Sequence, residues 1–347
     1  MPETKEEILA RMLSNISDEY DKTEGSFFYD AEMPVAIELE TKSAEADAIL
    51  DKGFPDTATG SYLDKIVSEQ GLVRKAAVKA TTTVTITGSA GASIALGAKV
   101  ASDSVNYLTT ESKTIDPGQT TMTVVVECEV AGSVGNVIAG AIKYFPVTIS
   151  GLTAVTNAAP VINGYDMETD DELRSRYYAK VQTPATSGNK YHYLNWAKSV
   201  TGVGDARVTP LWNGNGTVKV VIINSNKRAA DASLVTAVSD YIEEVRPIGA
   251  TVTVESAAEL EIDVSATLTL QVGHVLANVK AAIEANLTQY LKEIAFVETY
   301  VSYARIGSLI LDTEGVLDYT GLTVNAGTAN VTITDAQVAV LGVTTFV

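Results

Sequence analysis

The spacing of apolar positions changes along the chain. Up to about residue 75, apolar residues recur every three to four positions, which is the period of an α-helix. Thr4 and Glu7 have the spacing of a capping box, so we expect a helix to begin there and to carry Ile8, Met12 and Ile16 on one stripe. Two further helices are expected over residues 34–50 and 61–70. The N-terminal segment is therefore predicted to be helical.

From Ala80 the period falls to two. The run TTTVTIT at residues 81–87 alternates Val84 and Ile86 with threonines, the pattern of a half-buried strand. Similar runs follow at residues 99–101, 107–109, 122–129 and 141–149. Glycines between these runs suit turns and bulges, because glycine tolerates positive φ. This stretch is predicted to form a small all-β domain.

After Asn163, helical and strand patterns alternate. Thr169 and Ser187 are expected to cap two helices. Strands at 206–209 and 217–223, a helix at 231–245 and a strand at 251–255 then predict a β-β-α-β unit. That order recurs in part in a strand at 261–270, helices at 275–292 and 303–313, and strands at 317–324, 330–334 and 338–344.

The predicted fold class is multidomain α+β, because 347 residues exceed what one hydrophobic core usually serves. We expect an N-terminal helical, partner-binding segment at residues 1–75 and a β-rich domain at 76–160. An α+β module with a β-β-α-β core follows at 161–256, and a second α+β module in tandem at 257–347.

Charge and composition limit the kinds of partner that the chain is expected to bind. The chain has 25 basic and 43 acidic residues, and this net charge of −18 repels phosphate backbones and anionic lipid. No stretch approaches about 18 apolar residues, and the N-terminus lacks the pattern of a signal peptide. Cys128 is the single cysteine, so no disulfide forms within one chain. We expect synthesis in the cytoplasm, no nucleic-acid partner and no membrane insertion.

Residues typical of catalysis are sparse. The chain has two histidines, His192 within a Tyr-His-Tyr run and His274 beside a predicted helix start, and both are expected to be packed or surface residues. Cys128 lies in an apolar strand, where a thiol usually serves as a small buried group. We therefore predict no catalytic, cofactor-binding or metal-binding residues and no enzymatic activity.

One acidic run and one glycine-rich run could each be either a ligand site or a purely structural feature. The carboxylates Asp166, Glu168, Asp170, Asp171 and Glu172 could ligate calcium, but they lack the spaced glycine and closing glutamate of a calcium loop. A helix start, where carboxylates bind free N–H groups, is favoured. Asn213 to Gly216 lacks the spacing of a phosphate-binding loop and is expected to be a hairpin turn.

Several blocks, in order, resemble the baseplate J-like family of contractile phage tails and related injection particles. They are GSYLD at 60–64, GLVRKAAVKA at 71–80, TTTVTITG at 81–88, GSVGNVIAGAI at 132–142, NGYDMETDDELRSRYY at 163–178, YHYLNWAKSVTGVGDARV at 191–208 and RPIGATVTV at 246–254. The sequence departs from the family at Asn163, where a paired glycine is common, and at residues 94–97, where the family has a proline-rich loop. Neither departure affects the fold argument.

The resemblance implies a structural wedge subunit that assembles around a central hub with other wedge proteins. It also implies further copies of the chain in a ring, rearrangement when the sheath contracts, and a final location in a virion, prophage or tailocin-like particle. A surface adhesin or host-binding module of a tail is the main alternative, and a glycan-trimming enzyme is a second. The adhesin would require a ligand pocket with exposed aromatic side chains. The enzyme would require a pair of catalytic carboxylates or a set of metal ligands.

One interface is predicted from the residues themselves. Ile8, Met12 and Ile16 form an apolar stripe on a helix near the N-terminus, where little local chain is expected to cover it. We therefore expect this stripe to pack against a partner chain or a second copy.

Overall fold

The computed structural model describes residues 2–183 and 185–347. Contacts divide these residues into two compact units. The first, here called the arm unit, comprises residues 2–74 and 168–182; the second, the body unit, comprises residues 75–167 and the described part of 183–347. The four-part division from the sequence stays a prediction, and helix α4 groups with the N-terminal helices.

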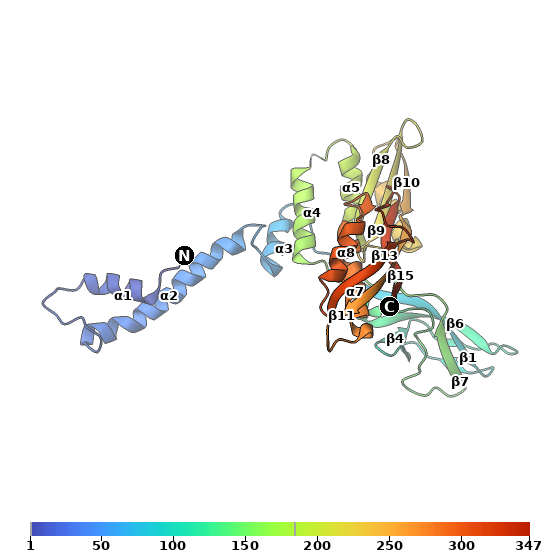
Figure 1. Cartoon of the computed structure of the whole chain (residues 1–347), viewed down its shortest axis with the longest axis horizontal. Helices are drawn as coiled ribbons and strands as arrows, with labels where there is room; N and C mark the ends of the chain where they lie inside the picture. Colours follow the sequence, from blue (N-terminus) through green and yellow to red (C-terminus); the bar gives the residue numbers. More distant parts are fainter. Residues whose placement is uncertain (1, 184) are drawn as a thin grey trace. The chain divides into compact units, whose positions relative to one another are not determined.

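The arm unit is helical, as the apolar spacing predicted (Figure 1). Its helices are α1 (Lys5–Ser14), α2 (Phe27–Gly53), α3 (Gly60–Ser68) and α4 (Asp170–Gln182). The capping box is confirmed, because Thr4 Oγ1 accepts from the Glu7 N–H and the Glu7 carboxylate accepts from the Thr4 N–H. The expected start of the second helix near Pro34 is wrong. Helix α2 begins seven residues earlier, at Phe27 after the cap Ser26, and Pro34 lies inside the helix.

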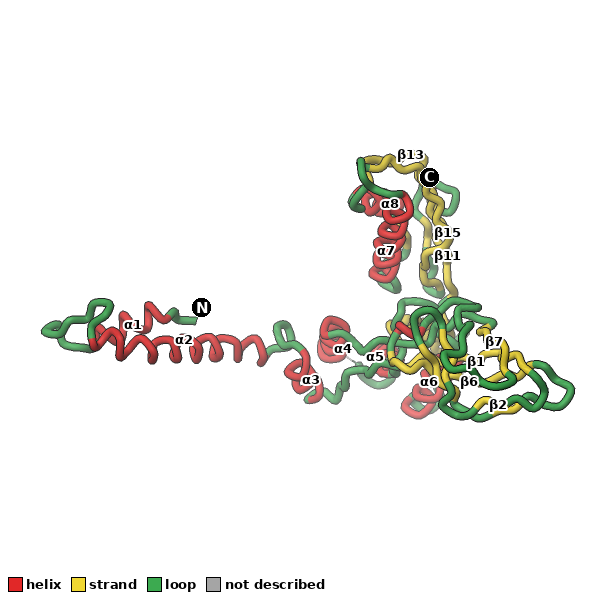
Figure 2. Tube along the Cα trace, turned by 90° about the horizontal axis from the view of Figure 1, so that it is seen from below, coloured by secondary structure: helices red, strands yellow, loops and turns green. Residues whose placement is uncertain are grey.

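Helix α1 runs antiparallel along α2 (Figures 1 and 2). The Glu3 N–H donates to Ser43 Oγ and the Lys5 N–H donates to Glu40, so the start of α1 lies beside the middle of α2. The connection between the helices returns the chain to the start of α2. There the ring of Tyr20 packs on that of Phe28, with 5.0 Å between the ring centroids. The pair is thus a helical hairpin.

The first part of the body unit is the predicted β domain. Its five-stranded antiparallel sheet has the order β3-β4-β6-β1-β7. The strands are β1 (Lys79–Gly88), β3 (Lys99–Ala101), β4 (Asn106–Thr109), β6 (Thr121–Ala131) and β7 (Leu152–Asn157), with a separate pair β2 (Ser93–Ile94) and β5 (Lys113–Thr114) and a 3-10 turn η1 (Ser133–Gly135). The apolar alternation in β1 is confirmed, because Val84 and Ile86 are fully buried.

The strand predicted at residues 141–149 is wrong. This segment has no strand beyond an isolated bridge at Tyr144, and the last strand of the sheet is β7. The buried side chain of Asn157 supplies the reason. Its Oδ1 accepts from the Ile142 N–H at 2.9 Å and its Nδ2 donates to the Ile138 carbonyl, just before the segment, at 2.9 Å. A side chain therefore takes the place of a strand partner at Ile142.

The next part has the predicted β-β-α-β order. Its elements are α5 (Lys190–Ser199), β8 (Val203–Pro210), β9 (Thr217–Asn224), α6 (Ala232–Val245) and β10 (Thr251–Ser256). The sheet order is β10-β9-β8, with β8 antiparallel and β10 parallel to β9. The helix expected at 231–245 is confirmed as α6, and Asp231 caps it. Helix α5 is capped by Asn189, whose amide oxygen accepts two N–H groups, and not by Ser187.

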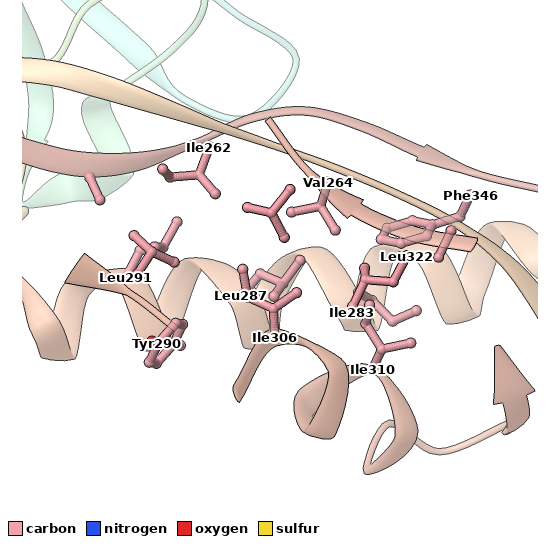
Figure 3. Close-up of a cluster of buried hydrophobic side chains, with 14 of the residues drawn as sticks. Ile262, Val264, Ile283, Leu287, Tyr290, Leu291, Ile306, Ile310, Leu322 and Phe346 are labelled. Carbon is pink, nitrogen blue, oxygen red and sulfur yellow. The ribbon is translucent and has the colours of Figure 1, made fainter. Parts of the chain in front are cut away.

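The last part packs two helices on one face of a sheet ordered β13-β11-β15. Its elements are β11 (Ala258–Leu270), α7 (Leu276–Ile294), β12 (Tyr300–Val301), α8 (Tyr303–Leu311), β13 (Val316–Val324), β14 (Val331–Thr332) and β15 (Gln337–Phe346). Figure 3 shows Ile283 and Leu287 of α7 and Ile306 of α8 lying between their helices and the sheet residues Ile262 and Val264. The whole chain is therefore α+β, as predicted.

Strand β9 joins the last two parts through its two faces. Val220 and Ile222 pack with residues of α5 and α6. Val221 and Ile223 point to the other face, where they pack with Ala295, Val338 and other residues of the C-terminal part. Because both faces of one strand are buried, these two parts share apolar packing instead of meeting only at a linker.

Candidate functional site

The histidines and the cysteine have structural surroundings. His192 Nδ1 accepts from the Gly188 N–H at 3.0 Å, and its ring stacks on Trp196 at 4.9 Å. Cys128 is fully buried in the β domain. His274 lies against Gly315, where an added Cβ would be 2.5 Å from Nδ1. Within residues 2–183 and 185–347, no three His, Cys, Asp or Glu side chains gather closely enough to hold a metal ion.

The acidic run before α4 forms a helix start, as favoured from the sequence. Thr169 Oγ1 accepts from the Glu172 N–H at 3.3 Å, and the Glu172 carboxylate accepts from the Thr169 N–H at 3.0 Å. Asp166 accepts from both the N–H and the hydroxyl of Ser133. The run thus supplies a capping box and a loop contact.

The other carboxylates of this run bind arginines within the arm unit. Arg176 donates to both carboxylate oxygens of Glu168 at 2.7 Å, and both residues are buried. Arg74 lies between two aspartates, with its Nη2 at 2.7 Å from Asp64 Oδ1 and at 2.6 Å from Asp170 Oδ1. Hydrogen bonding from the Gly60 N–H, and then from Arg74, lowers the pKa of Asp170. We call these five residues the arginine clamp; it ties α3 and α4 together.

The linker between the β domain and α4 is fixed to the β domain. The Gly164 N–H donates to Asn136 Oδ1 at 2.9 Å, and the Gly164 carbonyl accepts from Asn136 at 2.9 Å and from Asn226 at 3.0 Å. A Cβ added at Gly164 would lie 2.4 Å from the Gly132 carbonyl oxygen. The missing side chain of Gly164 therefore allows close packing, and its hydrogen bonds hold this part of the linker in place.

The predicted interface stripe of α1 faces its own chain. Ile8 is 1% exposed and Leu9 is 5% exposed, and both pack on Ala36 of α2. The expectation that little local chain covers the stripe is therefore wrong, because α2 covers it. Met12 packs at the edge of the same cluster, and Ile16 lies beyond the end of α1 and is half-buried. A partner contact at Met12 and Ile16 stays a prediction.

Helix α2 has a second apolar face that α1 leaves open. Seven exposed apolar residues lie on the side of α2 away from α1, most of them three, four or seven positions apart. We call them the α2 stripe: Phe27, Ala31, Val35, Leu39, Ala46, Ile49 and Leu50. Phe27 is 79% exposed, and Ile49 and Leu50 are 63% and 62% exposed. At 1.5 Å per residue, the 10 residues of α1 span about 15 Å and the 27 of α2 about 40 Å. Much of α2 therefore extends beyond α1.

The hairpin is also strongly acidic. Residues 2–53 contain 14 acidic and 5 basic side chains, a net charge of −9 and half of the charge of the whole chain. Exposed apolar patches that are bordered by charged residues are typical of protein interaction sites. The α2 stripe is thus the candidate functional site of the described residues.

Comparison with known proteins decides the family. Models of the baseplate J-like barrel domain, central domain and C-terminal domain match residues 83–164, 185–256 and 262–346. The phage-like element PBSX protein XkdT of Bacillus subtilis is 35% identical over 98% of this chain and 96% of its own. The chain belongs to the baseplate J-like family. The resemblance read from the sequence motifs is therefore confirmed.

The chain is also similar to a phage baseplate protein and, more distantly, to a chain of one solved structure. Baseplate protein gp47 of Escherichia phage Mu is 32% identical over 54% of this chain and 53% of its own length. A chain of the cryo-EM structure of the anti-feeding prophage (AFP) baseplate aligns over 99% of both chains at 12% identity, with a TM-score of 0.39. The family models begin at residue 83, so the α2 stripe lies outside them, although the alignment with XkdT extends over nearly the whole chain.

Sequence reasoning missed the α2 stripe because it placed the only uncovered face on α1. A signal was present, since Phe27, Ala31, Val35 and Leu39 repeat at intervals of four. The expected start at Pro34 removed the first two of them from the helix.

No helix in the described part of the chain is long and apolar enough to cross a membrane.

Proposed function

We propose that this chain is a structural wedge subunit of the baseplate of a contractile tail or a phage-tail-like injection particle. It joins other wedge and hub proteins, with further copies of itself in a ring, is made in the cytoplasm and ends in the assembled particle. Membership of the baseplate J-like family supports the setting. The observation that carries the proposal is the α2 stripe, an apolar helical face that the described residues of its own unit leave exposed.

The α2 stripe suits a helix from another baseplate protein. A helix laid along another helix buries side chains at intervals of three and four, which is the spacing of the stripe. The flanks of the stripe are acidic, so the partner helix is expected to carry basic residues beside its apolar face. Two hairpins alone would bring a charge of −9 against −9, which disfavours a contact made only of two copies.

The body unit supplies stiffness during the proposed rearrangement. Strand β9 shares its packing between two parts of the body, and Gly164 is fixed by three hydrogen bonds. Rearrangement on sheath contraction then takes place where subunits meet, with the body moving as one rigid part. No covalent chemistry is required.

Co-expression tests this function. The chain is produced together with the products of the reading frames beside its own, purified, and weighed by native mass spectrometry. Stoichiometric heteromeric complexes are the expected result. A stable monomer that ignores every neighbouring product but binds a glycan or a cell surface would instead favour a host-binding module.

A further inference from the structure

One charged residue lies in the middle of the α2 stripe. Lys42 comes three residues after Leu39 and four before Ala46, so it lies on the same face of α2 as these two stripe residues. Its side chain is 66% exposed. On an amphipathic helix the charged residues usually occupy the polar face, whereas this lysine interrupts a row of exposed apolar side chains. A contact that covers the stripe therefore covers Lys42 as well.

The second half of the stripe has the spacing of a coiled-coil seam. From Val35, the residues on this face follow at intervals of four, three, four and three: Leu39, Lys42, Ala46 and Ile49. This alternation has an average repeat of about 3.5 residues, which keeps one helix in contact with another along a left-handed supercoil. Lys42 occupies one of the seam positions. The partner that fits this face is therefore a helix, whose side chains pack around Lys42.

The ammonium group of Lys42 has an exposed carboxylate beside it in the free chain. Lys42 Nζ donates to Glu45 Oε2 at 2.7 Å, and the side chain of Glu45 is 61% exposed. An exposed ion pair of this kind contributes little to stability. An ammonium group has three N–H donors, so donors remain for another acceptor. When a helix covers the stripe, the charge leaves water and requires that acceptor.

We propose that Lys42 selects the partner helix and fixes its position along α2. The partner helix, from another baseplate subunit, carries an Asp or Glu within its own apolar seam, and this carboxylate accepts from Lys42 Nζ. A single polar residue in an apolar seam fixes the alignment of two helices, because other alignments bury an unpaired charge. The carboxylate lies within the seam, whereas the basic residues expected of this helix lie beside it.

The same lysine disfavours pairing between two copies of this chain. In a parallel pair of α2 helices in the same alignment, Lys42 would face Lys42, and the like charges would repel. The role of Lys42 rests on the proposed function, because it defines the chemistry of the same contact.

The first test replaces Lys42 with leucine. Isothermal titration calorimetry measures the dissociation constant of the purified chain for the subunit with which it co-purifies. If a partner carboxylate accepts from Lys42, then Lys42→Leu leaves that carboxylate buried without its cation, and binding is expected to weaken by about tenfold or more. If no carboxylate faced Lys42, leucine would extend the apolar face, and binding would stay equal or tighten. Equal or tighter binding overturns the proposal.

The second test reverses the charge and seeks its rescue. Lys42→Glu alone is expected to weaken binding by about tenfold or more. Lys52→Glu is the control, since it changes the net charge equally but lies ten residues further along α2, about 80° around the helix and outside the stripe. It should bind within about threefold of the parent.

Each acidic residue of the partner helix is then changed to lysine in turn. One of these variants is expected to restore the binding of Lys42→Glu to within about threefold of the parent, because it rebuilds the ion pair with its signs exchanged. Rescue by none of them, or by all of them equally, overturns the proposal.

The outcomes separate the role of Lys42 from the wedge function. If the parent binds a neighbouring subunit and Lys42→Leu binds it equally well, the role of Lys42 is overturned and the wedge function stands. A parent chain that binds none of the neighbouring subunits overturns both. Homodimers of the parent joined through α2 would show that a second copy covers the stripe, which also overturns the proposal.

Discussion

The arm hairpin and the C-terminal part of the body bury their apolar residues in opposite ways. In the C-terminal part, 18 buried residues from two helices and a sheet form one cluster. In the hairpin, only Ile8, Leu9 and Ala36 form the buried cluster, and α2 leaves a longer apolar face open. The C-terminal part therefore buries its apolar residues within itself, whereas the hairpin leaves an apolar face exposed, and we propose that another chain covers this face. Stability and assembly should therefore respond to different mutations.

The largest effect is expected where the arm unit has its own buried charge pair. Arg176→Ala leaves the Glu168 carboxylate buried without its bidentate partner, which should cost about 3–5 kcal/mol of arm stability. Hydrogen exchange should show faster exchange of amides in α3 and α4. The control is Lys42→Ala, which removes an exposed ion pair with Glu45 and should change little. Equal effects of the two variants would refute a structural role for the arginine clamp.

A matched pair of leucines sharpens the comparison directly. Leu287 is 1% exposed in the C-terminal cluster and Leu39 is 42% exposed on the α2 stripe. Leu287→Ala should lower the free energy of unfolding by about 2–5 kcal/mol, because it opens a cavity. Leu39→Ala should change it by no more than about 0.5 kcal/mol. Denaturant unfolding measures both, and a large loss with Leu39→Ala would mean that the α2 stripe is covered in the free chain.

A smaller effect is expected at the fixed linker. Gly164→Ala places a Cβ against the Gly132 carbonyl oxygen, and the strain should cost about 1–3 kcal/mol. Gly118→Ala is a control for substitution of a glycine with open surroundings in the β domain. Gly118 has a φ of +83°, which strains alanine by itself, whereas Gly164 has no positive φ. A loss with Gly164→Ala at least as large as that with Gly118→Ala is therefore due to the close contact. If Gly164→Ala proved the milder change, the linker would be looser than its contacts indicate.

The smallest effect concerns pH. The pKa of Asp170 is lowered in the folded arm by the Gly60 N–H and Arg74. Its contribution to stability is therefore complete above the unfolded aspartate pKa of about 3.9 and is lost as the pH falls through the lower folded value. Hydrogen exchange of α3 and α4 as a function of pH should show this acid loss. Asp170→Asn should weaken the dependence, and an unchanged profile would remove Asp170 as its source.

Local patterns predicted much of the fold. The capping box at Thr4, the helix at residues 231–245 and the alternation in β1 all depend on residues close in sequence, and all are confirmed. The prediction for segment 141–149 was wrong because the distant Asn157 side chain, and not a neighbouring strand, accepts from the Ile142 N–H. The α2 stripe was missed since apolar residues on two opposite faces blur a single helical period.

The most direct test of the account compares Leu39→Asp with Ile37→Asp during co-expression with the neighbouring subunits. The two residues are 42% and 44% exposed, but they lie on opposite flanks of α2, and only Leu39 belongs to the α2 stripe. Native mass spectrometry should show that Leu39→Asp loses the heteromeric complex, because it buries an unpaired charge at the contact, while Ile37→Asp keeps it. Complexes of equal abundance from both variants would contradict the claim that the α2 stripe joins this subunit to the baseplate.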